Sequence, residues 1–300
     1  MPPDGFDIAA MSLRLNKNDF FLTAMNSVVV AERHPQADFP SHDHDFDELV
    51  IVWRGNGLHI WNDIPYPITC GDLFYINSKD RHSYESVNEL ALDNVLFCRE
   101  RLGLVADWAQ LLPGGDVSQE QRYWRLSTLG MSVLRDKVDE LAKECMKSEP
   151  LSVQLSEALL MQLALLLLRF RHRPDSGVLP DAHQLDLLLM ALRASIATPF
   201  HLETFCQQHL LNPRVLRSLF KQYTGMSVTH YLRQLRLCRA MSLLRYGNMT
   251  ISDVAAECGF DDSNYFSVVF SRACGVSPRD YRQRFTGQIG KISVSVTTAG

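Results

Sequence analysis

The segment Ile251-Ser-Asp-Val-Ala-Ala-Glu-Cys-Gly259, followed directly by Phe260-Asp-Asp-Ser-Asn-Tyr-Phe-Ser-Val-Val-Phe-Ser-Arg272, decides the architecture of this chain. It predicts a helix with a small, apolar inner face, a tight turn, and a second helix with polar groups outside, which is a helix-turn-helix unit. Gly259 stands where the first helix needs a left-handed residue, a conformation that glycine adopts without a Cβ clash. The segment from Leu202 to Gly225 repeats the pattern, with Asn212 as a cap and Pro213 in the first helical position.

One long helix is predicted between the two units. Apolar residues recur at near-helical spacing from Ser227 to Tyr246. A helix of this length measures about 30 Å, and the major grooves on one face of B-DNA recur about every 34 Å. The spacing therefore allows one chain to insert two recognition helices into successive major grooves. We expect residues 183–285 to form an all-α DNA-binding domain.

The outward faces of the two second helices supply candidate DNA contacts. An arginine fork matches guanine, asparagine matches adenine, and an aspartate accepts a hydrogen bond from cytosine N4. A solvated surface or a phosphate contact is the alternative for each residue. The candidates are Arg214, Arg217 and Ser218 in the first unit and Asp262, Asn264 and Ser267 in the second. We expect Arg233, Arg236, Arg239 and Arg272 to contact phosphates or form surface ion pairs.

The same region resembles a known family. The segments Ile251–Ala255, Cys258–Phe260, Tyr265–Ser267 and Phe270–Pro278 resemble the signature of the AraC/XylS family of bacterial transcription regulators. The resemblance implies an activator that contacts the σ subunit of RNA polymerase through acidic residues such as Asp253. The alternative for this residue is stabilisation of the helix N-terminus at which it lies.

The charge is distributed unevenly along the chain. The net charge of the 300 residues is −4, but residues 183–285 hold 12 Arg and Lys against 7 Asp and Glu, whereas residues 1–182 hold 17 against 27. A basic C-terminal part suits contact with phosphates, and the acidic N-terminal part would repel DNA. The asymmetry indicates a sensor joined to a DNA-binding domain.

Cysteine usage and hydropathy indicate a soluble, cytoplasmic protein. The 7 cysteines are scattered without a C-x-x-C pair, so we expect buried apolar thiols in a reducing compartment. No signal peptide is recognisable at the start. The longest apolar run, Ala158–Leu168, is too short to cross a bilayer and predicts a buried helix.

The N-terminal part predicts a small β-barrel. Short β-type runs separated by Gly, Asn and Asp turns fill residues 20–122, after an extension or disordered segment at 1–19. Two helices follow in 123–172, and the second, about Val153–Arg171, is apolar nearly all round. Such a helix is buried by a second subunit or by its own barrel, and the family resemblance favours a homodimer. Residues 173–182 predict a linker and 286–300 an irregular tail, which makes the chain an α+β multidomain protein.

A polar pattern inside the predicted barrel resembles the cupin signature. His42 and His44, which share one face of a strand, are followed by Glu48, Gly55, Gly71-Asp72 and His82. In metal-dependent cupins such residues bind one ion, so a metal-dependent enzyme fused to a DNA-binding domain is one alternative. The family resemblance implies instead a barrel that holds a small effector, with no catalytic or metal site. Histidines satisfied by backbone carbonyls are the third possibility.

A sugar effector needs convergent donors and acceptors and an aromatic face within a mostly apolar pocket. The residues that fit are His42, His44, Glu48, Trp53, Tyr75 and His82, each of which could instead belong to the core. Two segments, Asp45–His59 and Gly71–Ile76, resemble the sensor domain of the L-rhamnose operon activators, and Phe260–Phe270 resembles their second recognition helix. The resemblance implies L-rhamnose as effector, no other cofactor, and an inverted-repeat promoter site upstream of rhamnose regulatory genes. The residues alone indicate only an effector-gated DNA-binding protein, so a different effector stays an alternative.

Overall fold

The computed structural model describes residues 13–112, 117–118, 120–147, 149–172 and 180–284. The chain forms two compact units, one composed mainly of residues before 183 and one composed mainly of residues after it. Most of the linker predicted at 173–182 and the whole tail at 286–300 lie outside the described residues. The segment predicted as an extension is ordered from Leu13 onwards, because β1 pairs with β3 and the Lys17 amide donates to Asp45 Oδ1 at 2.6 Å.

The first unit is built on one sheet of eight strands, whose order is β1-β3-β7-β4-β6-β8, with β2 on β7 and β5 on β4. The strand β1 runs parallel to β3, whereas β2, β3 and β4 are antiparallel to β7, and β6 is antiparallel to β4 and β8. The strands are β1 (Leu13–Leu15), β2 (Val28–Arg33), β3 (Phe39–His44), β4 (Asp47–Trp61), β5 (Ile64–Thr69), β6 (Asp72–Ile76), β7 (His82–Phe97) and β8 (Tyr123–Arg125).

Two strands are much longer than the short runs in the sequence suggest. The predicted runs on either side of Gly55 form the single strand β4, and those on either side of residues 88–90 form β7. The register between β4 and β7 shifts between Val52 and Leu58, and Gly55 has φ 77° with the Glu89 carbonyl 2.2 Å from the position of a Cβ. Bulges of this kind bend both strands together, so the sheet curls without breaking.

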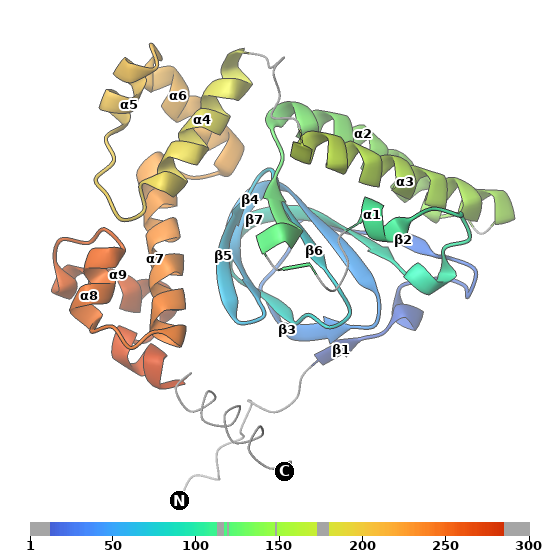
Figure 1. Ribbon diagram of the computed structural model, residues 1–300, viewed down its shortest axis with the longest axis horizontal. Coiled ribbons are helices and arrows are strands. Elements are labelled where there is room, and N and C mark those ends of the chain that lie inside the picture. The colour runs from blue at the N-terminus through green and yellow to red at the C-terminus, as the bar shows by residue number, and fades with distance from the viewer. Residues whose placement is uncertain (1–12, 113–116, 119, 148, 173–179, 285–300) are drawn as a thin grey trace, which may run out of the picture. The chain divides into compact units, whose positions relative to one another are not determined.

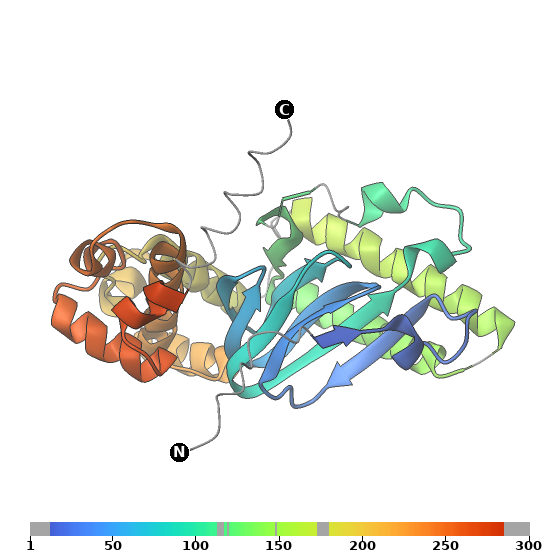
Figure 2. The same ribbon diagram turned by 90° about the horizontal axis from the view of Figure 1, so that it is seen from below.

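The alternation of side chains gives the curled sheet two different faces. Leu49, Ile51 and Trp53 of β4 belong to the core that packs under the helices α2 (Thr128–Cys145) and α3 (Pro150–His172). The residues that alternate with them along β4, beginning with Glu48, point to the opposite, inner face. Figure 1 and Figure 2 both show α2 and α3 lying side by side across one side of the barrel.

The helix α3 contains the one segment among the described residues, Pro150–Phe170, that by length and composition could cross a membrane. This helix is longer than the apolar run from which we expected a buried helix. Its inner side packs in the barrel core through Leu160, Leu163, Ala164 and Leu167. The buried Glu157 carboxylate also accepts hydrogen bonds from Ser27 Oγ and the amides of residues 103 and 104. The packed side therefore has the contacts of a core helix in a globular domain.

The second unit is entirely helical among its described residues after Gln184. Its helices are α4 (Pro180–Ala194), α5 (Leu202–Gln208), α6 (Pro213–Thr224), α7 (Val228–Tyr246), α8 (Ile251–Glu257) and α9 (Ser263–Cys274). The helix α7 has 19 residues, which corresponds to about 28 Å. The expected turns are present, because Gly259 has φ 71° and Asn212 Oδ1 accepts from the Arg214 and Val215 amides at 2.9 and 3.2 Å. Both helix-turn-helix units and the long helix between them are confirmed.

Candidate DNA-binding faces and effector cavity

The helix α6 presents the polar face that the sequence predicts for the first recognition helix. Phe220 is fully buried, whereas Arg214, Arg217 and Ser218 are exposed. The Arg217 guanidinium forms an ion pair with Glu203 of α5, and both side chains are more than half exposed. This pairing was not expected from the sequence.

The helix α9 presents the second polar face, but its predicted residues differ in availability. Asn264 is exposed, while Ser267 is half-buried and its hydroxyl donates to a backbone carbonyl one turn earlier. Asp262 is the N-cap, since Oδ1 accepts from the amides of Asn264 and Tyr265 at 2.6 and 3.1 Å. A capping carboxylate is held at the helix N-terminus, which limits its freedom to reach a base. Tyr265 and Val268, exposed by 54% and 58%, extend this face with apolar surface, and of these two only Val268 was expected there as a contact for a thymine methyl.

Arg236 of α7 has a structural role, so the expectation of a phosphate contact or surface ion pair is wrong for this residue. Its guanidinium donates to the carbonyls of Ile196, Thr198 and Gly259 at 3.0, 2.9 and 2.8 Å. These three carbonyls belong to the chain after α4 and to the turn between α8 and α9. Arg236 therefore fixes the second helix-turn-helix unit to the long helix.

Asp253 lies in the first turn of α8 and forms a capping box with Thr250. Its carboxylate accepts from the Thr250 hydroxyl at 2.7 Å, and its amide donates to that hydroxyl at 3.1 Å. The side chain remains exposed. Asp253 therefore stabilises the helix N-terminus. Its contact with the polymerase stays a prediction, with which the exposed position agrees.

An inner cavity of about 270 Å³ opens on the inner face of the barrel. Three polar atoms at this cavity, Glu48 Oε1, Tyr84 Oη and Asn94 Oδ1, are buried and have no hydrogen-bond partner among the described residues. A buried polar group without a partner is costly, so a ligand that hydrogen-bonds here recovers that energy. The cavity is lined by Leu15, Phe20, Ala31, Arg33, Pro35, Gln36, Ala37, Phe39, His42, Phe46, Glu48, Tyr84, Asn94 and Leu96.

The structure brings four of the six predicted effector residues together at this inner face. His44 Nε2 and His82 Nε2 lie 3.2 and 3.5 Å from the same Glu48 oxygen, and the His42 ring lies 4.1 Å from that of His82. Burial lowers the pKa of His82 well below its usual value and that of His59 to about 3. Burial also lowers the pKa of His44, but the contact with Glu48 outweighs it and leaves this pKa raised. Metal-ligating atoms of His44, Glu48 and His82 all lie within 4.8 Å of one another, so this set could hold a metal ion.

The two predicted aromatic residues lie on the opposite, helix-covered face. The Trp53 indole donates to Asp93 at 2.6 Å, and the Arg135 guanidinium carbon lies 4.0 Å from the centre of its ring. Trp53 therefore connects the sheet to α2 and lines neither cavity described here.

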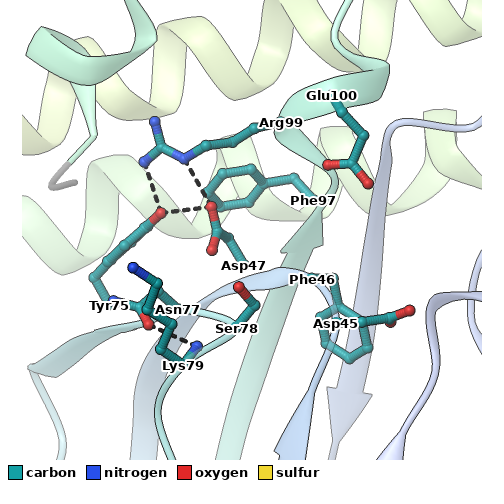
Figure 3. A pocket seen from close by; sticks show the side chains of 10 residues that line it. All are labelled: Asp45, Phe46, Asp47, Tyr75, Asn77, Ser78, Lys79, Phe97, Arg99 and Glu100. Atoms are coloured by element: carbon teal, nitrogen blue, oxygen red, sulfur yellow. Dashed lines mark hydrogen bonds and ion pairs between the residues drawn. The ribbon is translucent and has the colours of Figure 1, made fainter. Parts of the chain in front are cut away.

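Tyr75 lines a second, outer hollow of about 320 Å³. Figure 3 shows its hydroxyl beside Asp47 and Arg99, at 2.8 and 2.7 Å, and burial raises the pKa of this hydroxyl. Because Tyr75, Asp47 and Arg99 already hydrogen-bond to one another, these three groups are less available to a ligand than the unpartnered atoms at the inner cavity. Its lining residues are Asp45, Phe46, Asp47, Tyr75, Asn77, Ser78, Lys79, Phe97, Arg99 and Glu100.

Two exposed recognition faces on a helical frame, and a barrel with a ligand-sized cavity, define a DNA-binding regulator that senses a small molecule. Residues 205–284 match the family model described as a helix-turn-helix domain, and residues 25–164 match that of the AraC-like ligand binding domain. The chain is 66% identical to the "HTH-type transcriptional activator RhaR" of Pectobacterium atrosepticum, over 92% of this chain and 98% of that relative. It is 53% identical to the protein of the same name from Yersinia pseudotuberculosis serotype O:3, over 91% of this chain and 94% of that relative.

The chain belongs to the AraC family of helix-turn-helix transcriptional activators, as its sequence and both domains show. The predicted α+β architecture, with an AraC-type ligand-binding domain before a helical DNA-binding domain, is confirmed. So is the expectation of a DNA-binding activator, and the alternative of an enzyme is excluded.

Proposed function

We propose that this activator responds to L-rhamnose, which binds in the inner cavity of the barrel. The resemblance of the sensor segments to the L-rhamnose operon activators, and the shared name of the relatives, support this sugar. L-Rhamnose is a 6-deoxyhexose, so it presents hydroxyls on several carbons and a methyl group on one. The cavity has matching chemistry, since buried polar atoms face it beside the apolar surfaces of Phe39, Phe46 and Leu96.

The single observation that carries the choice of cavity is the set of unpartnered atoms on Glu48, Tyr84 and Asn94. Removing one partner of a buried hydrogen bond costs about 1–3 kcal/mol, which corresponds to a loss of roughly 5- to 150-fold in affinity. We expect Tyr84→Phe and Asn94→Leu to weaken L-rhamnose binding by this amount in isothermal titration calorimetry. Tyr75→Phe, which changes the outer hollow, is the matched control and should bind like the unmodified chain. If Tyr75→Phe loses affinity and Tyr84→Phe keeps it, the effector binds in the outer hollow.

The specificity for a deoxysugar is tested with L-mannose, which carries a hydroxymethyl group in place of the methyl group of L-rhamnose. Burial of that hydroxyl against an apolar surface without a partner should lower the affinity at least several-fold. Equal binding of the two sugars would contradict the proposed contact between the methyl group and the apolar wall.

We also propose that two chains pair through α3. The exposed side of this helix carries residues at alternating spacings of four and three, which is the repeat of a coiled-coil seam. Leu151, Leu155 and Leu165 on this side are exposed by 70%, 53% and 51%. The complete series is Leu151, Leu155, Ala158, Gln162, Leu165 and Arg169. Leu155→Glu should convert the dimer to a monomer in sedimentation velocity, whereas Gln154→Glu, one position away, should leave the mass unchanged.

On DNA, each chain of the dimer places α6 and α9 in successive major grooves of one half of an inverted-repeat promoter site. Arg214, Arg217 and Asn264 read bases, and Asp253 contacts the σ subunit of RNA polymerase in the cytoplasm. Binding to a rhamnose promoter fragment, with and without the sugar, tests the whole proposal. DNA binding and transcription that respond to L-rhamnose support the proposal. DNA binding that does not change with the sugar would support the DNA contacts but contradict L-rhamnose as the effector.

A further inference from the structure

Residues 34–38, which join β2 to β3, form part of the rim of the inner cavity, and we call this segment the rim loop. Three of its residues, Pro35, Gln36 and Ala37, line the cavity. Pro35 and Ala37 are also exposed at the surface, so the loop lies between the cavity and the solvent. Exposed loops with few buried apolar contacts are the segments that open most readily, and such loops control access to many binding sites.

Two backbone amides fix the middle and the end of the rim loop to β7. The Gln36 amide donates to the Leu90 carbonyl at 2.7 Å. The Val87 amide donates to Asp38 Oδ1 at 3.0 Å. Because an amide exchanges its hydrogen with water when its hydrogen bond opens, these two amides report how often the loop leaves the strand.

The start of the rim loop is held to β7 by a side-chain contact. His34 Nε2 lies 2.9 Å from Asp93 Oδ1, which is within the distance of an ion pair. The His34 side chain is exposed by 37%, whereas that of Asp93 is exposed by 3%. One partner is therefore fixed in the interior, and the other can turn into water. This asymmetry is what a contact that opens and closes repeatedly requires.

Asp93 is held in position from the side of the sheet that the helices cover. Its Oδ2 accepts from the Trp53 indole at 2.6 Å, and the Arg135 guanidinium of α2 lies over the Trp53 ring. Burial raises the pKa of Asp93, and the contacts with Trp53 and His34 oppose the rise. The next residue, Asn94, turns its unpartnered Oδ1 to the inner cavity. One stretch of β7 thus holds the rim loop with one face and offers an acceptor to a ligand with the other.

We infer that Asp93 is a positioning residue for effector binding, which acts through His34 to hold the rim loop closed over the inner cavity. The pair opens before a ligand passes the rim, so its strength sets the rates at which the effector enters and leaves. Asp93 does not touch the ligand, because it does not line the cavity and its carboxylate faces Trp53 and His34. The effect on the sugar rests on the proposed effector site, whereas the tethering of the loop does not.

Hydrogen exchange followed by mass spectrometry tests the tether on the full chain without a ligand. His34→Ala and Asp93→Asn should each raise the exchange rate of the Gln36 amide roughly 2- to 5-fold, because a partly exposed ion pair is lost. Trp53→Phe should act in the same direction, and should add nothing in the His34→Ala background, because it works through the same pair. His201→Ala, which removes an exposed imidazole from the second unit, is the matched control. Circular dichroism checks the fold of each variant.

Stopped-flow mixing with L-rhamnose, followed by tryptophan fluorescence, tests the effect on the effector. In His34→Ala the association and dissociation rate constants should both rise roughly 2- to 5-fold, so that Kd changes less than either rate. A substitution that only loosened the packing of the barrel would raise the dissociation rate and lower the affinity without faster association. The association rate therefore distinguishes a loop that controls access from a merely structural contact.

Unchanged exchange of the Gln36 amide in both His34→Ala and Asp93→Asn would overturn the inference. Faster exchange with an unchanged association rate would overturn the control of access by the loop. If the unmodified chain does not bind L-rhamnose at all, the proposed effector is wrong, and the amide exchange still decides whether the pair holds the loop. Faster exchange together with faster association and dissociation supports the inference and the proposed site.

Discussion

Two glycines in the DNA-binding domain provide a matched test of how the second helix-turn-helix unit is held. Gly259 after α8 and Gly275 after α9 have nearly the same conformation, with φ 71° and 72°. A left-handed conformation costs an L-residue about 1–2 kcal/mol, so alanine should carry this cost at both positions. The surroundings differ, because a Cβ at Gly275 meets nothing within 4 Å, whereas one at Gly259 lies 2.6 Å from the Ile196 carbonyl oxygen and 2.9 Å from the Arg236 guanidinium.

The additional cost at Gly259 follows from the contacts of Arg236. The guanidinium and the carbonyl that a methyl group would displace are hydrogen-bonded to each other. Loss of one hydrogen bond to a charged group costs about 1.5–3 kcal/mol. We therefore expect Gly259→Ala to destabilise the domain by about 2.5–5 kcal/mol and Gly275→Ala by about 1–2 kcal/mol.

Thermal unfolding of the full chain should be followed by two signals, since two units need not unfold in one step. All 4 tryptophans precede residue 183, so their fluorescence reports the barrel, while far-ultraviolet circular dichroism reports all helices. A domain of about 100 residues loses about 4–8 °C in Tm per kcal/mol. The dichroism transition of Gly259→Ala should fall well below that of Gly275→Ala, with unchanged fluorescence. Equal shifts in the two variants would refute the assignment of Arg236 as the residue that fixes this unit.

Two further predictions concern ion pairs. Asp80 and Arg122 are a buried pair in the barrel. Burial opposes ionisation of Asp80, but the hydrogen bond from Arg122, those from Asn77 and Asn62, and the charge of Arg122 together outweigh it and hold the pKa of Asp80 below its usual 3.8. The pair therefore stabilises the barrel fully above pH 3.8 and loses this effect as the pH falls through the lower, folded-state pKa. Arg122→Met leaves an unpaired buried carboxylate and should cost about 3–5 kcal/mol at pH 7 by tryptophan fluorescence, with a smaller difference in acid; a constant difference would contradict the reasoning. Glu203→Gln should raise promoter affinity a few-fold, because the exposed pair with Arg217 is worth about 0.2–1 kcal/mol and has to break on DNA; a lower affinity in a gel-shift titration would mean that Glu203 positions the guanidinium.

The DNA-binding domain could be predicted without the structure, because its sequence signals are local. Asn212 begins one helix and Gly259 ends another through contacts within a few residues. The apolar spacing of α7 depends only on the helical period. The same reasoning correctly gave the two helices expected in 123–172, of which the second was expected from about Val153 and begins at Pro150. The roles of Arg236 and Asp262 were harder to predict, since only contacts made after folding distinguish them from ordinary surface residues.

Which of the candidate effector residues share a site could not be predicted before the folded structure was known. Each of the six residues has a side chain that can bind a sugar. Strand alternation, however, puts some of them on the face that α2 and α3 cover and the others on the inner face. Trp53 and Tyr75 lie on the covered face, where they hydrogen-bond to neighbouring side chains. The histidines meet Glu48 on the other face because β3 and β4 both pair with β7. The residue types come from the sequence, but the face on which each one lies depends on register and helix packing, which join segments far apart in the chain.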